Sequence, residues 1–354
     1  MMMSTTLRED FAELAASPEI YAALQQRKVY VTGASGQIGW YLVRFLCFLI
    51  DSGQLRCELS AHLRSPRRLQ EKFPDHASLP CRFVVNEDAA ADLGSPAPDL
   101  LIHCAGLASP KHFGSAPVDV MHANGILTHA LLERLRSDNP ACRFIYLSTT
   151  GVTGFIPDDQ RPSRESDYGP LSSIELGNCY LESKRFGEML CLAYRRQYGI
   201  PVLIVRPSIT YGPGFDLDDG RSYADFINAL LGRKPIRLTS DGSAIRNFLY
   251  IADFVRGLLT AHTRAEAGSV LNIASPAPIS ILELAQLLND SALPEPLGQV
   301  ERVNEEHAGM RRVNFKSTNA SVEQLQALGW QPRFGHLDGF QRTLRHYQES
   351  NQCT

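Results

Sequence analysis

The sequence predicts an α/β protein built on a doubly wound parallel sheet, with a smaller mixed α/β lobe toward the C-terminus. Two observations predict this fold class. An apolar run that begins at Lys28 leads straight into Gly33, Gly36 and Gly39, the order of a buried strand, a tight turn and a helix start. Strand-like runs then alternate with helical patterns through residue 206, which is typical of a parallel sheet of the Rossmann type.

The composition favours a large cytoplasmic protein with a small-molecule partner. The chain has 354 residues, of which 44% are hydrophobic, so we expect two lobes with a substantial core. The formal net charge is only −3, which gives no indication of a nucleic-acid partner. No run reaches the roughly 18 apolar residues that a membrane span needs, so we expect no membrane partner.

Cysteine and histidine usage agree with this interpretation. The eight cysteines form no CxxC pair and lie mostly within apolar segments, so we expect buried thiols and a reducing, cytoplasmic compartment. The ten histidines are scattered without the HxxxH or HExxH spacing of metal ligands, so we expect no metal.

We expect the chain to be divided into a helical prefix and two lobes. Residues 1–26 carry apolar positions at helical spacing, broken at Ser17-Pro18, and are expected to pack on the first lobe. The remaining stretches are the Rossmann-type dinucleotide-binding domain (27–206, with 248–276 returning to it) and the substrate-binding lobe (207–247 and 277–354).

The elements follow from the same patterns. Strands are expected at residues 28–32, 57–62, 82–85, 100–104, 144–147, 202–206 and 270–274. Helices are expected at residues 38–50, 118–136, 178–198, 222–231, 250–261 and 280–288. The turn residues Asp241-Gly242 suit a hairpin, and the loop at 155–177, rich in Pro, Asp and Gly, is expected to face the substrate.

The glycine turn is the candidate cofactor site. Its glycines let the backbone approach a pyrophosphate, which the amide N–H groups at the helix N-terminus would hold. The alternative is a glycine turn without a ligand. The candidate cofactor-binding residues are Gly33, Ser35, Gly36, Gln37, Ile38 and Gly39 at the turn, Asp88 toward the adenine, Ala105 and Asn124 toward the nicotinamide side, and also Arg64, Tyr180 and Lys184.

The end of the second expected strand bears on the choice between NAD and NADP. NAD enzymes usually place an acidic residue there to bind the ribose 2′-hydroxyl. No acidic residue stands at the end of this strand. Arg64, with Arg67 or Arg68, is suited instead to a 2′-phosphate, although a solvated helix start explains the same residues. The cofactor is therefore expected to be NADP or NAD, with NADP slightly favoured.

Three residues suggest redox chemistry on a hydroxyl group. Tyr180 and Lys184 stand four apart, so on a helix they share one face, and an ammonium beside the phenol is expected to lower its pKa. Thr149 follows the fifth strand, at the edge where ligands bind in such sheets. Thr149 would bond the reacting hydroxyl, Tyr180 would take its proton, and a nicotinamide would take hydride. A buried Tyr and a snorkelling Lys are the structural alternative.

An ordered set of motifs covers residues from about 27 to 345. They are GASGQIG, HCAGLASP, Asn124 with Thr128, LSTTGVTG, YLESK, VRPSITYGPG, DDGRSYADFI and DGSAIRNFLYIAD. In this order they resemble the extended short-chain dehydrogenase/reductases of the nucleotide-sugar epimerase/dehydratase family. LASPKHF and GPGFDLDDGR are most similar to the UDP-glucuronate decarboxylase and dTDP-glucose dehydratase-like branch.

The resemblance implies that a nucleotide diphosphate sugar is oxidised at C4 by bound NAD(P). It also implies a homodimer formed through the helices at 118–136 and 178–198. Carried over by motif, the catalytic residues are Thr149, Tyr180 and Lys184, and the substrate-binding residues are Ser109, Thr150, Arg221 and Arg246. A bidentate guanidinium suits phosphate oxygens, so Arg246 is expected to meet the substrate diphosphate.

Departures from the family pattern narrow the expected reaction. Decarboxylases of this branch carry Glu where this chain has Gly151, and 4,6-dehydratases carry Asp-Glu where it has Thr150-Gly151. The family's VYG tyrosine is Thr153, and the Asn three residues after the arginine of strand six is Ile209.

We therefore expect an epimerase or a 4-ketoreductase. One alternative is a decarboxylase or 4,6-dehydratase with a relocated acid/base, for which Asp158, Asp159, Glu165 and Asp167 of the 155–177 loop are the candidates. The other alternative is a non-catalytic nucleotide-sugar binding protein on the same fold.

Overall fold

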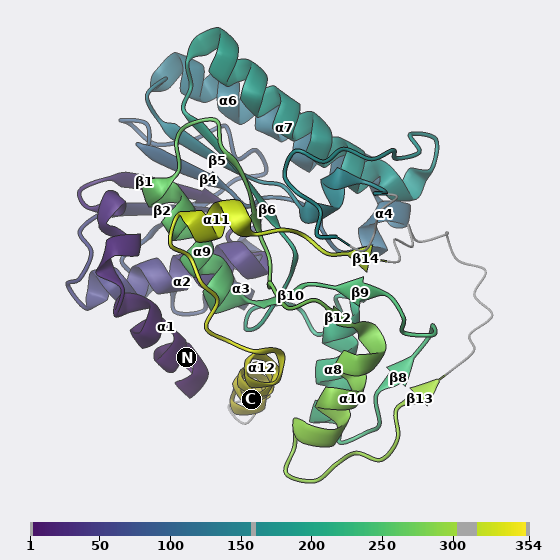
Figure 1. The fold of residues 1–354 in the computed structure, drawn as a ribbon. Helices are drawn as coiled ribbons and strands as arrows, with labels where there is room; N and C mark the ends of the chain where they lie inside the picture. The colour runs from purple at the N-terminus through teal and green to yellow at the C-terminus, as the bar shows by residue number, and fades with distance from the viewer. Residues whose placement is uncertain (1–2, 157–160, 303–316, 352–354) are drawn as a thin grey trace.

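The computed structural model describes residues 3–156, 161–302 and 317–351 (Figure 1). At its centre is a seven-stranded parallel sheet in the order β11-β6-β5-β4-β1-β2-β3. The strands are β1 (Lys28–Thr32), β2 (Glu58–Leu63), β3 (Arg82–Val85), β4 (Leu100–His103), β5 (Arg143–Leu147), β6 (Val202–Pro207) and β11 (Val270–Ile273). The predicted fold class is confirmed.

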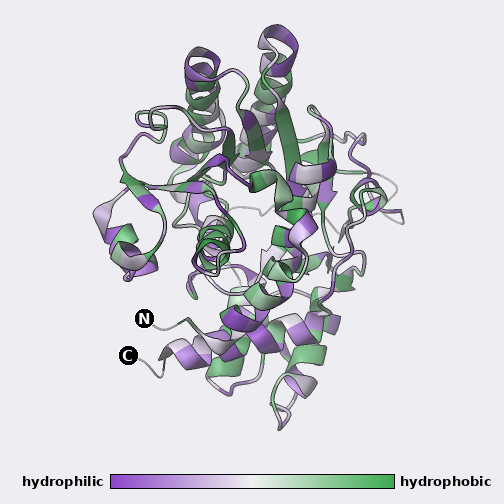
Figure 2. Cartoon of the chain, turned by 90° about the vertical axis from the view of Figure 1, so that its left-hand side faces the viewer, coloured by the Kyte–Doolittle hydropathy of each residue, from purple (hydrophilic) through white to green (hydrophobic). Residues whose placement is uncertain are grey.

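Helices cover both faces of this sheet (Figure 1). On one face lie α2 (Gln37–Asp51), α3 (Pro66–Lys72) and α9 (Ile251–Arg264), and on the other lie α6 (Leu127–Asp138) and α7 (Cys179–Tyr198). Val29 and Val31 of β1 belong to the core cluster of the first face, and Tyr30 belongs to the cluster of the second. Because both faces are covered, the strands are mostly apolar, which is why they can be predicted from the sequence (Figure 2).

The helix expected at 118–136 is interrupted. Its parts are α5 (Pro117–Met121), a π-helical turn η4 (His122–Ile126) and α6. The turn contains Asn124, one of the expected cofactor residues, and such π-bulges are frequent at functional sites. Hydrophobic periodicity predicts the whole stretch as helix and cannot detect one extra residue in a turn.

The smaller lobe contains α8 (Ser222–Leu231), α10 (Ile281–Ser291) and two small sheets (Figure 1). The predicted hairpin at Asp241-Gly242 is wrong, because the flanking strands pair elsewhere. The sheets are β12 (Ile279–Ser280), β9 (Ile245–Arg246) and β14 (Ser317–Thr318) in one, and β13 (Glu301–Arg302) with β8 (Arg237–Leu238) in the other. The Asp241 carboxylate accepts from the N–H and hydroxyl of Ser243, so this turn is closed by a side chain.

A parallel strand pair links the two lobes, namely β7 (Ile209–Tyr211) and β10 (Phe248–Tyr250). The shorter elements are α4 (Lys111–Ser115), α11 (Glu323–Ala327) and the single turns η3 (His76–Ser78), η5 (Thr150–Thr153) and η6 (Leu176–Asn178). The C-terminal part, expected as a small mixed region, ends in the 16-residue helix α12 (His336–Asn351).

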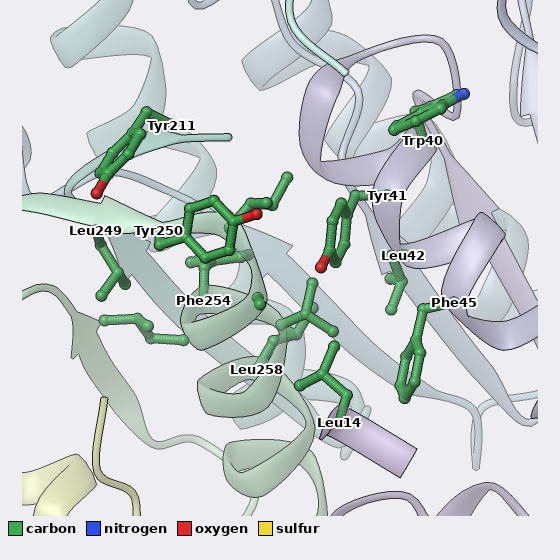
Figure 3. Close-up of a cluster of buried hydrophobic side chains, with 14 of the residues drawn as sticks. Leu14, Trp40, Tyr41, Leu42, Phe45, Tyr211, Leu249, Tyr250, Phe254 and Leu258 are labelled. Atoms are coloured by element: carbon green, nitrogen blue, oxygen red, sulfur yellow. The ribbon is translucent and has the colours of Figure 1, made fainter. Parts of the chain in front are cut away.

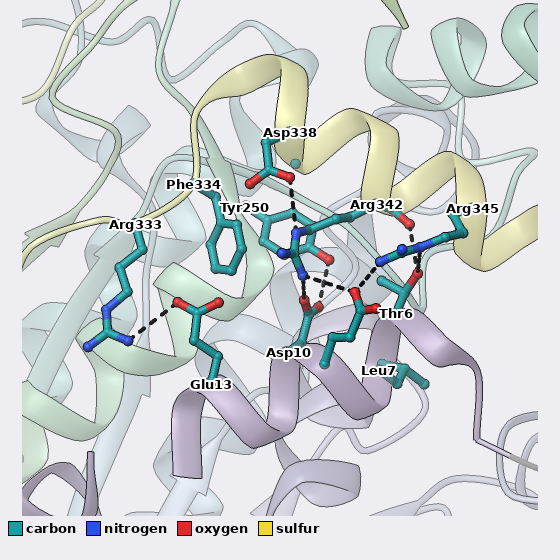
Figure 4. Close-up of polar contacts among 12 residues, drawn as sticks. Thr6, Leu7, Asp10, Glu13, Tyr250, Arg333, Phe334, Asp338, Arg342 and Arg345 are labelled. Carbon is teal, nitrogen blue, oxygen red and sulfur yellow. Dashed lines mark hydrogen bonds and ion pairs between the residues drawn. The ribbon is translucent and has the colours of Figure 1, made fainter. Parts of the chain in front are cut away.

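The N-terminal prefix is helical, as predicted, and comprises α1 (Thr5–Ala15), η1 (Pro18–Ile20) and η2 (Ala22–Leu24). Leu7, Phe11 and Leu14 of α1 are buried in the main core, and Figure 3 shows Leu14 among the side chains of that core. The fully buried Asp10 accepts hydrogen bonds from the hydroxyls of Tyr41 and Tyr250 and from Arg342 of α12 (Figure 4). The prefix thus ties helix α2, strand β10 and the C-terminal helix together.

The seven described cysteines are free, four of them buried and three half-buried (Cys57, Cys81 and Cys104); Cys353 lies outside the described residues. Within the described ranges, no helix is both long and apolar enough to cross a membrane.

Candidate active site

The glycine turn is packed too tightly for side chains. Gly33 has a φ of +68°, and a Cβ there would lie 2.5 Å from the backbone nitrogen of Ala105. A Cβ on Gly39 would collide with the carbonyl of Gly33. These contacts bring β1, the start of α2 and the end of β4 together, as a dinucleotide-binding turn requires.

The N-terminus of α2 is open to an anion. Gly36 is the N-cap residue and supplies no side-chain hydrogen bond, so the first N–H groups of the helix, which include those of Gln37 and Ile38, have no side-chain cap. The half-buried Ser35 lies in the same turn. The side chain of Gln37 turns away and donates to the carbonyl of Gly212, 3.1 Å away.

At the end of β2, where the ribose of the cofactor is expected, one arginine has no hydrogen bond or ion pair among the described residues. Arg64 follows β2 directly, is exposed, and makes no hydrogen bond or ion pair with another residue in the part of the chain that the structure describes. Arg67 pairs with Glu71, and Arg68 pairs with Glu71 and Asp216. Of the three arginines suggested for a 2′-phosphate, only Arg64 is uncommitted. The carboxylate of Asp88 accepts from the N–H of Ala90 in an exposed turn.

Two buried polar groups meet beside Gly106. A Cβ on Gly106 would lie 3.0 Å from Asn124 Oδ1 and 3.4 Å from Lys184 Nζ. Asn124 donates to Ser183, but its Oδ1 is buried without a partner among the described residues. Lys184 donates to the carbonyl of Leu147 at 2.7 Å. An orphaned acceptor and an ammonium next to glycine backbone fit the hydroxyl groups of a nicotinamide ribose.

A hydrogen-bonded chain lies behind these groups. His103 Nδ1 is 2.8 Å from the Thr32 hydroxyl, and His103 Nε2 is 3.2 Å from that of Thr128, which donates to the carbonyl of Asn124. Burial lowers the pKa of His103 to about 3, so the ring is neutral. The chain joins β1, β4 and the π turn, and it fixes the backbone that presents Asn124.

Thr149 and Tyr180 come together at the carboxyl end of β5. The Thr149 side chain is near enough to the Tyr180 phenol to lower its pKa, and Lys184 lies one turn further along α7, with its Nζ 5.9 Å from the centre of the Tyr180 ring. The structure therefore brings together the three predicted catalytic side chains. It does so from a strand end and a helix, which hold side chains more rigidly than loops.

The expected lowering of the Tyr180 pKa by Lys184 is not found. Burial raises the pKa of Tyr180 to about 12, and this effect outweighs the opposing influence of Arg221 and of Thr149. Burial also lowers the pKa of Lys184 to about 8. The ammonium is directed at a backbone carbonyl rather than at the phenol, so helical spacing alone overestimated this contact.

An aromatic ring and an arginine also border the phenol. Phe113 of α4 stacks on Tyr180 with ring centres 5.1 Å apart and planes 11° apart. Arg221 lies close enough to influence the phenol and is held by Asp219, whose side chain is only 7% exposed. Ser109, expected to bind substrate, donates its hydroxyl to the carbonyl of Asp219. The stacking of Phe113 and the role of Asp219 are absent from the sequence prediction, although both belong to motifs that carry the resemblance.

Leu181 occupies the space beside Gly151. A Cβ on Gly151 would lie 2.8 Å from Leu181 Cδ2 and 3.7 Å from the hydroxyl of Thr149. The wall next to Thr149 is therefore apolar at this point. The hydroxyl-bearing Thr150 is buried at the start of η5.

These features match a known family. The model of the "NAD dependent epimerase/dehydratase family" matches residues 29–274, from the first strand of the sheet to its last. The chain belongs to this family. It is therefore an enzyme whose cofactor is NAD or NADP, and its relatives handle nucleotide sugars.

Relatives of several activities are similar to this family member. UDP-glucuronic acid decarboxylase 2 of Arabidopsis thaliana is 28% identical over 323 residues, which cover 91% of this chain and 68% of the relative. The dTDP-glucose 4,6-dehydratase DesIV of Streptomyces venezuelae, solved with NAD and TYD bound, has a TM-score of 0.76 at 25% identity, covering 92% of this chain and 98% of that chain. A Bacillus cereus UDP-glucuronic acid 4-epimerase, in complex with UDP-glucuronic acid and NAD, shares the fold with a TM-score of 0.73 at 22% identity, covering 91% and 99%.

Arg246, expected to meet the substrate diphosphate, lies on a short strand. It belongs to β9, in the three-stranded sheet of the smaller lobe, where burial lowers its pKa. Its assignment to the substrate diphosphate stays a prediction. Among the described residues, no group of three or more His, Cys, Asp or Glu side chains is arranged to hold a metal ion.

Proposed function

We propose that this enzyme oxidises and reduces a nucleotide diphosphate sugar at C4, as an epimerase or a 4-ketoreductase. The convergence of Thr149, Tyr180 and Lys184 next to the orphaned Asn124 Oδ1 carries this proposal. Gly33, Gly36 and Gly39 would hold the pyrophosphate of the cofactor, and Asn124 and Lys184 its nicotinamide ribose. NAD is bound in the similar DesIV structure. The cofactor, when bound, accepts and returns a hydride.

The side chains would act on the C4 hydroxyl. In its phenolate form, Tyr180 accepts the proton of this hydroxyl as the C4–H bond breaks and becomes a phenol, and Thr149 donates a hydrogen bond to the same oxygen. The carbon loses a hydride and the oxygen loses a proton, so the sugar becomes a 4-ketone. Return of the hydride to the opposite face of C4, and of the proton from Tyr180 to the carbonyl oxygen, gives the C4 epimer. Lys184, held by the carbonyl of Leu147, orients the ribose and supplies positive charge near the phenol.

The surroundings of Gly151 argue against a second chemical step. Loss of CO₂ or water after C4 oxidation needs a group that moves a proton or steers a carboxylate, and Leu181 fills the space beside Gly151 with methyl groups. Two carboxylates of the 155–177 loop are engaged elsewhere. Glu165 accepts from Asn272 and Gln324, and Asp167 accepts from Arg161 and Arg164. Asp158 and Asp159 lie outside the described residues.

A decarboxylase is the second candidate, because UDP-glucuronic acid decarboxylase 2 is 28% identical over 91% of this chain. Incubation with UDP-glucuronate and with dTDP-glucose, each with NAD and with NADPH, followed by mass spectrometry of the products, separates the candidates. We expect an isomer of unchanged mass or a reduced sugar. A loss of about 44 or 18 mass units, the arithmetic for CO₂ or H₂O, would establish the second chemical step and contradict the proposal.

For the cofactor we propose a modest preference for NADP, carried by the unengaged Arg64. Arg64→Ala should weaken NADP binding about tenfold and leave NAD binding unchanged, because one exposed contact with phosphate contributes roughly 1 to 2 kcal/mol. Titration of both cofactors measures this. Arg67→Ala is the matched control, since that guanidinium already pairs with Glu71. Equal or tighter binding of NAD by the wild type, with no effect of Arg64→Ala, contradicts the preference.

We also propose a homodimer with C2 symmetry through α5, η4 and α7. Five large apolar side chains on these neighbouring helices are between 48% and 76% exposed, which is unusual for a surface in water: Val118, Met121, Ile126, Phe186 and Met189. Light scattering at micromolar concentration should give twice the chain mass, and Met189→Glu should give the monomer. A wild-type monomer would contradict this assembly.

A further inference from the structure

The segment at residues 212–221, here called the substrate loop, connects β7 to α8 and ends at Arg221, whose charge acts on the Tyr180 phenol. At this end the loop is fastened to the opposite wall of the site. Ser109 donates to the carbonyl of Asp219 at 2.6 Å, and Lys111 donates to Asp218 at 3.2 Å. The position of Arg221 therefore depends on where the substrate loop is held.

The other end of the loop is held by elements of the cofactor site. Gln37, the first residue of α2, donates to the carbonyl of Gly212 at 3.1 Å. Lys72 of α3 donates to the carbonyl of Gly214 at 3.1 Å and to Asp216 at 2.6 Å. Arg68, also of α3, lies 3.3 Å from the same carboxylate. These contacts come from the pyrophosphate end and from the ribose end of the proposed cofactor site.

The loop between the two ends is packed rather than loose. The Trp40 ring of α2 lies against Gly214, where a Cβ would be 2.5 Å from the ring. Phe215 is buried against Tyr223 and Tyr347, and the Tyr347 hydroxyl donates to the Phe215 carbonyl at 2.6 Å. A packed segment transmits a displacement of its anchor, because its side chains have no empty space into which to relax.

We propose that the substrate loop couples the cofactor site to the sugar site, with Asp216 and Lys72 as positioning residues. Cofactor bound at α2 and α3 fixes the anchors, the anchors fix the loop, and the loop fixes Arg221 for the sugar. This inference rests on the proposed function. It adds a specific consequence, since by thermodynamic linkage cofactor and sugar must tighten each other's binding by the same factor.

Calorimetric titration of UDP-glucuronate and dTDP-glucose, each with and without saturating NAD, tests the coupling. For the wild type we expect at least fivefold tighter sugar binding with NAD, within the range typical of coupled sites. Asp216→Asn keeps the shape of the side chain and removes its charge. It should reduce the coupling to twofold or less, raise KM for the sugar severalfold, and leave kcat and the affinity for NAD alone nearly unchanged.

Two further variants make the result decisive. Lys72→Met, which removes the same ion pair from the α3 side, should repeat the loss of coupling if Asp216→Asn proves unstable. Glu301→Gln removes the charge of a carboxylate whose exposure, 43%, is close to the 46% of Asp216; its ion pair joins β13 to β8, away from the cofactor elements, so this variant should retain wild-type coupling. Wild-type coupling in both Asp216→Asn and Lys72→Met overturns the inference while leaving the proposed function intact. Absence of sugar binding and turnover in the wild type overturns both.

Discussion

The active site and the junction of α1 with α12 both bury polar side chains, but they differ in how those side chains are hydrogen-bonded. At the junction, the Asp10 carboxylate accepts from Tyr41, Tyr250 and Arg342 (Figure 4). At the active site, Asn124 Oδ1 and the Ser148 hydroxyl are buried without partners among the described residues. Asp10 is therefore committed to contacts within the protein, whereas these two groups near Tyr180 are available to a ligand.

The difference shows what each region contributes. A carboxylate with three donors rigidifies a contact between distant segments, and replacing it mainly affects stability. Some polar groups around Tyr180 have no hydrogen-bond partner among the described residues and can bind a ligand. Replacing the groups around Tyr180 mainly affects binding and turnover.

The largest effect is expected at the phenol. Tyr180→Phe removes the proton acceptor and keeps the stacking surface for Phe113, so kcat should fall by roughly 10² to 10⁴, with little change in cofactor affinity or melting temperature. Steady-state kinetics and cofactor titration measure this. Tyr198→Phe, on the same helix with a hydroxyl that accepts from neighbouring Gln197, should behave as wild type. A Tyr180→Phe enzyme that retains more than about a tenth of wild-type kcat would exclude Tyr180 as the base.

At the junction, a similar deletion should act on stability instead. Asp10→Ala leaves a guanidinium and two phenols without their shared acceptor, which should cost about 3 kcal/mol of unfolding free energy. The kcat of the folded enzyme should stay within about twofold. Urea unfolding and kinetics below the transition measure both. Glu58→Gln, which breaks a 4.0 Å pair at a side chain that is 78% exposed, should change stability by less than about 0.5 kcal/mol.

The comparison also explains what the sequence could predict. Local spacing and chain order determine the strands and the glycine turn, so the sequence predicts them. The same holds for the positions of Thr149, Tyr180 and Lys184. The junction is not, because Asp10 and Arg342 are separated by most of the chain and look like ordinary surface charges. For the same reason the sequence does not predict the contact of Asp216 with Lys72, although Asp216 belongs to the GPGFDLDDGR motif.

Other failures have energetic causes. Helical spacing places Tyr180 and Lys184 on one face, but it does not show that burial dominates the pKa values of both groups. The π turn at Asn124 adds one residue to a helix whose periodicity remains apolar on both sides. In each case the deciding quantity is the packing of distant elements, which is not encoded in a short sequence window.

The smallest expected effect concerns pH and tests how Asp10 is stabilised. Burial raises the pKa of Asp10 to about 6, although Tyr250, Tyr41 and Arg342 oppose the shift. The pKa of an unfolded aspartate is about 3.9, so between about pH 4 and pH 6 the folded state binds more protons than the unfolded state. The contribution of Asp10 to stability is therefore greatest at low pH and decreases as the pH rises through this window.

Asp10→Asn cannot titrate at this position, so the stability difference between wild type and variant isolates the effect. The advantage of the wild type should shrink by about 1 to 2 kcal/mol between pH 4.5 and pH 7, measured by urea unfolding at both values. If the advantage grows with pH instead, the three donors outweigh burial and hold Asp10 as an anion, as in an ordinary ion pair. The junction would then derive its stability from charge pairing with Arg342, and its contrast with the active site would rest on electrostatics rather than on hydrogen-bond satisfaction.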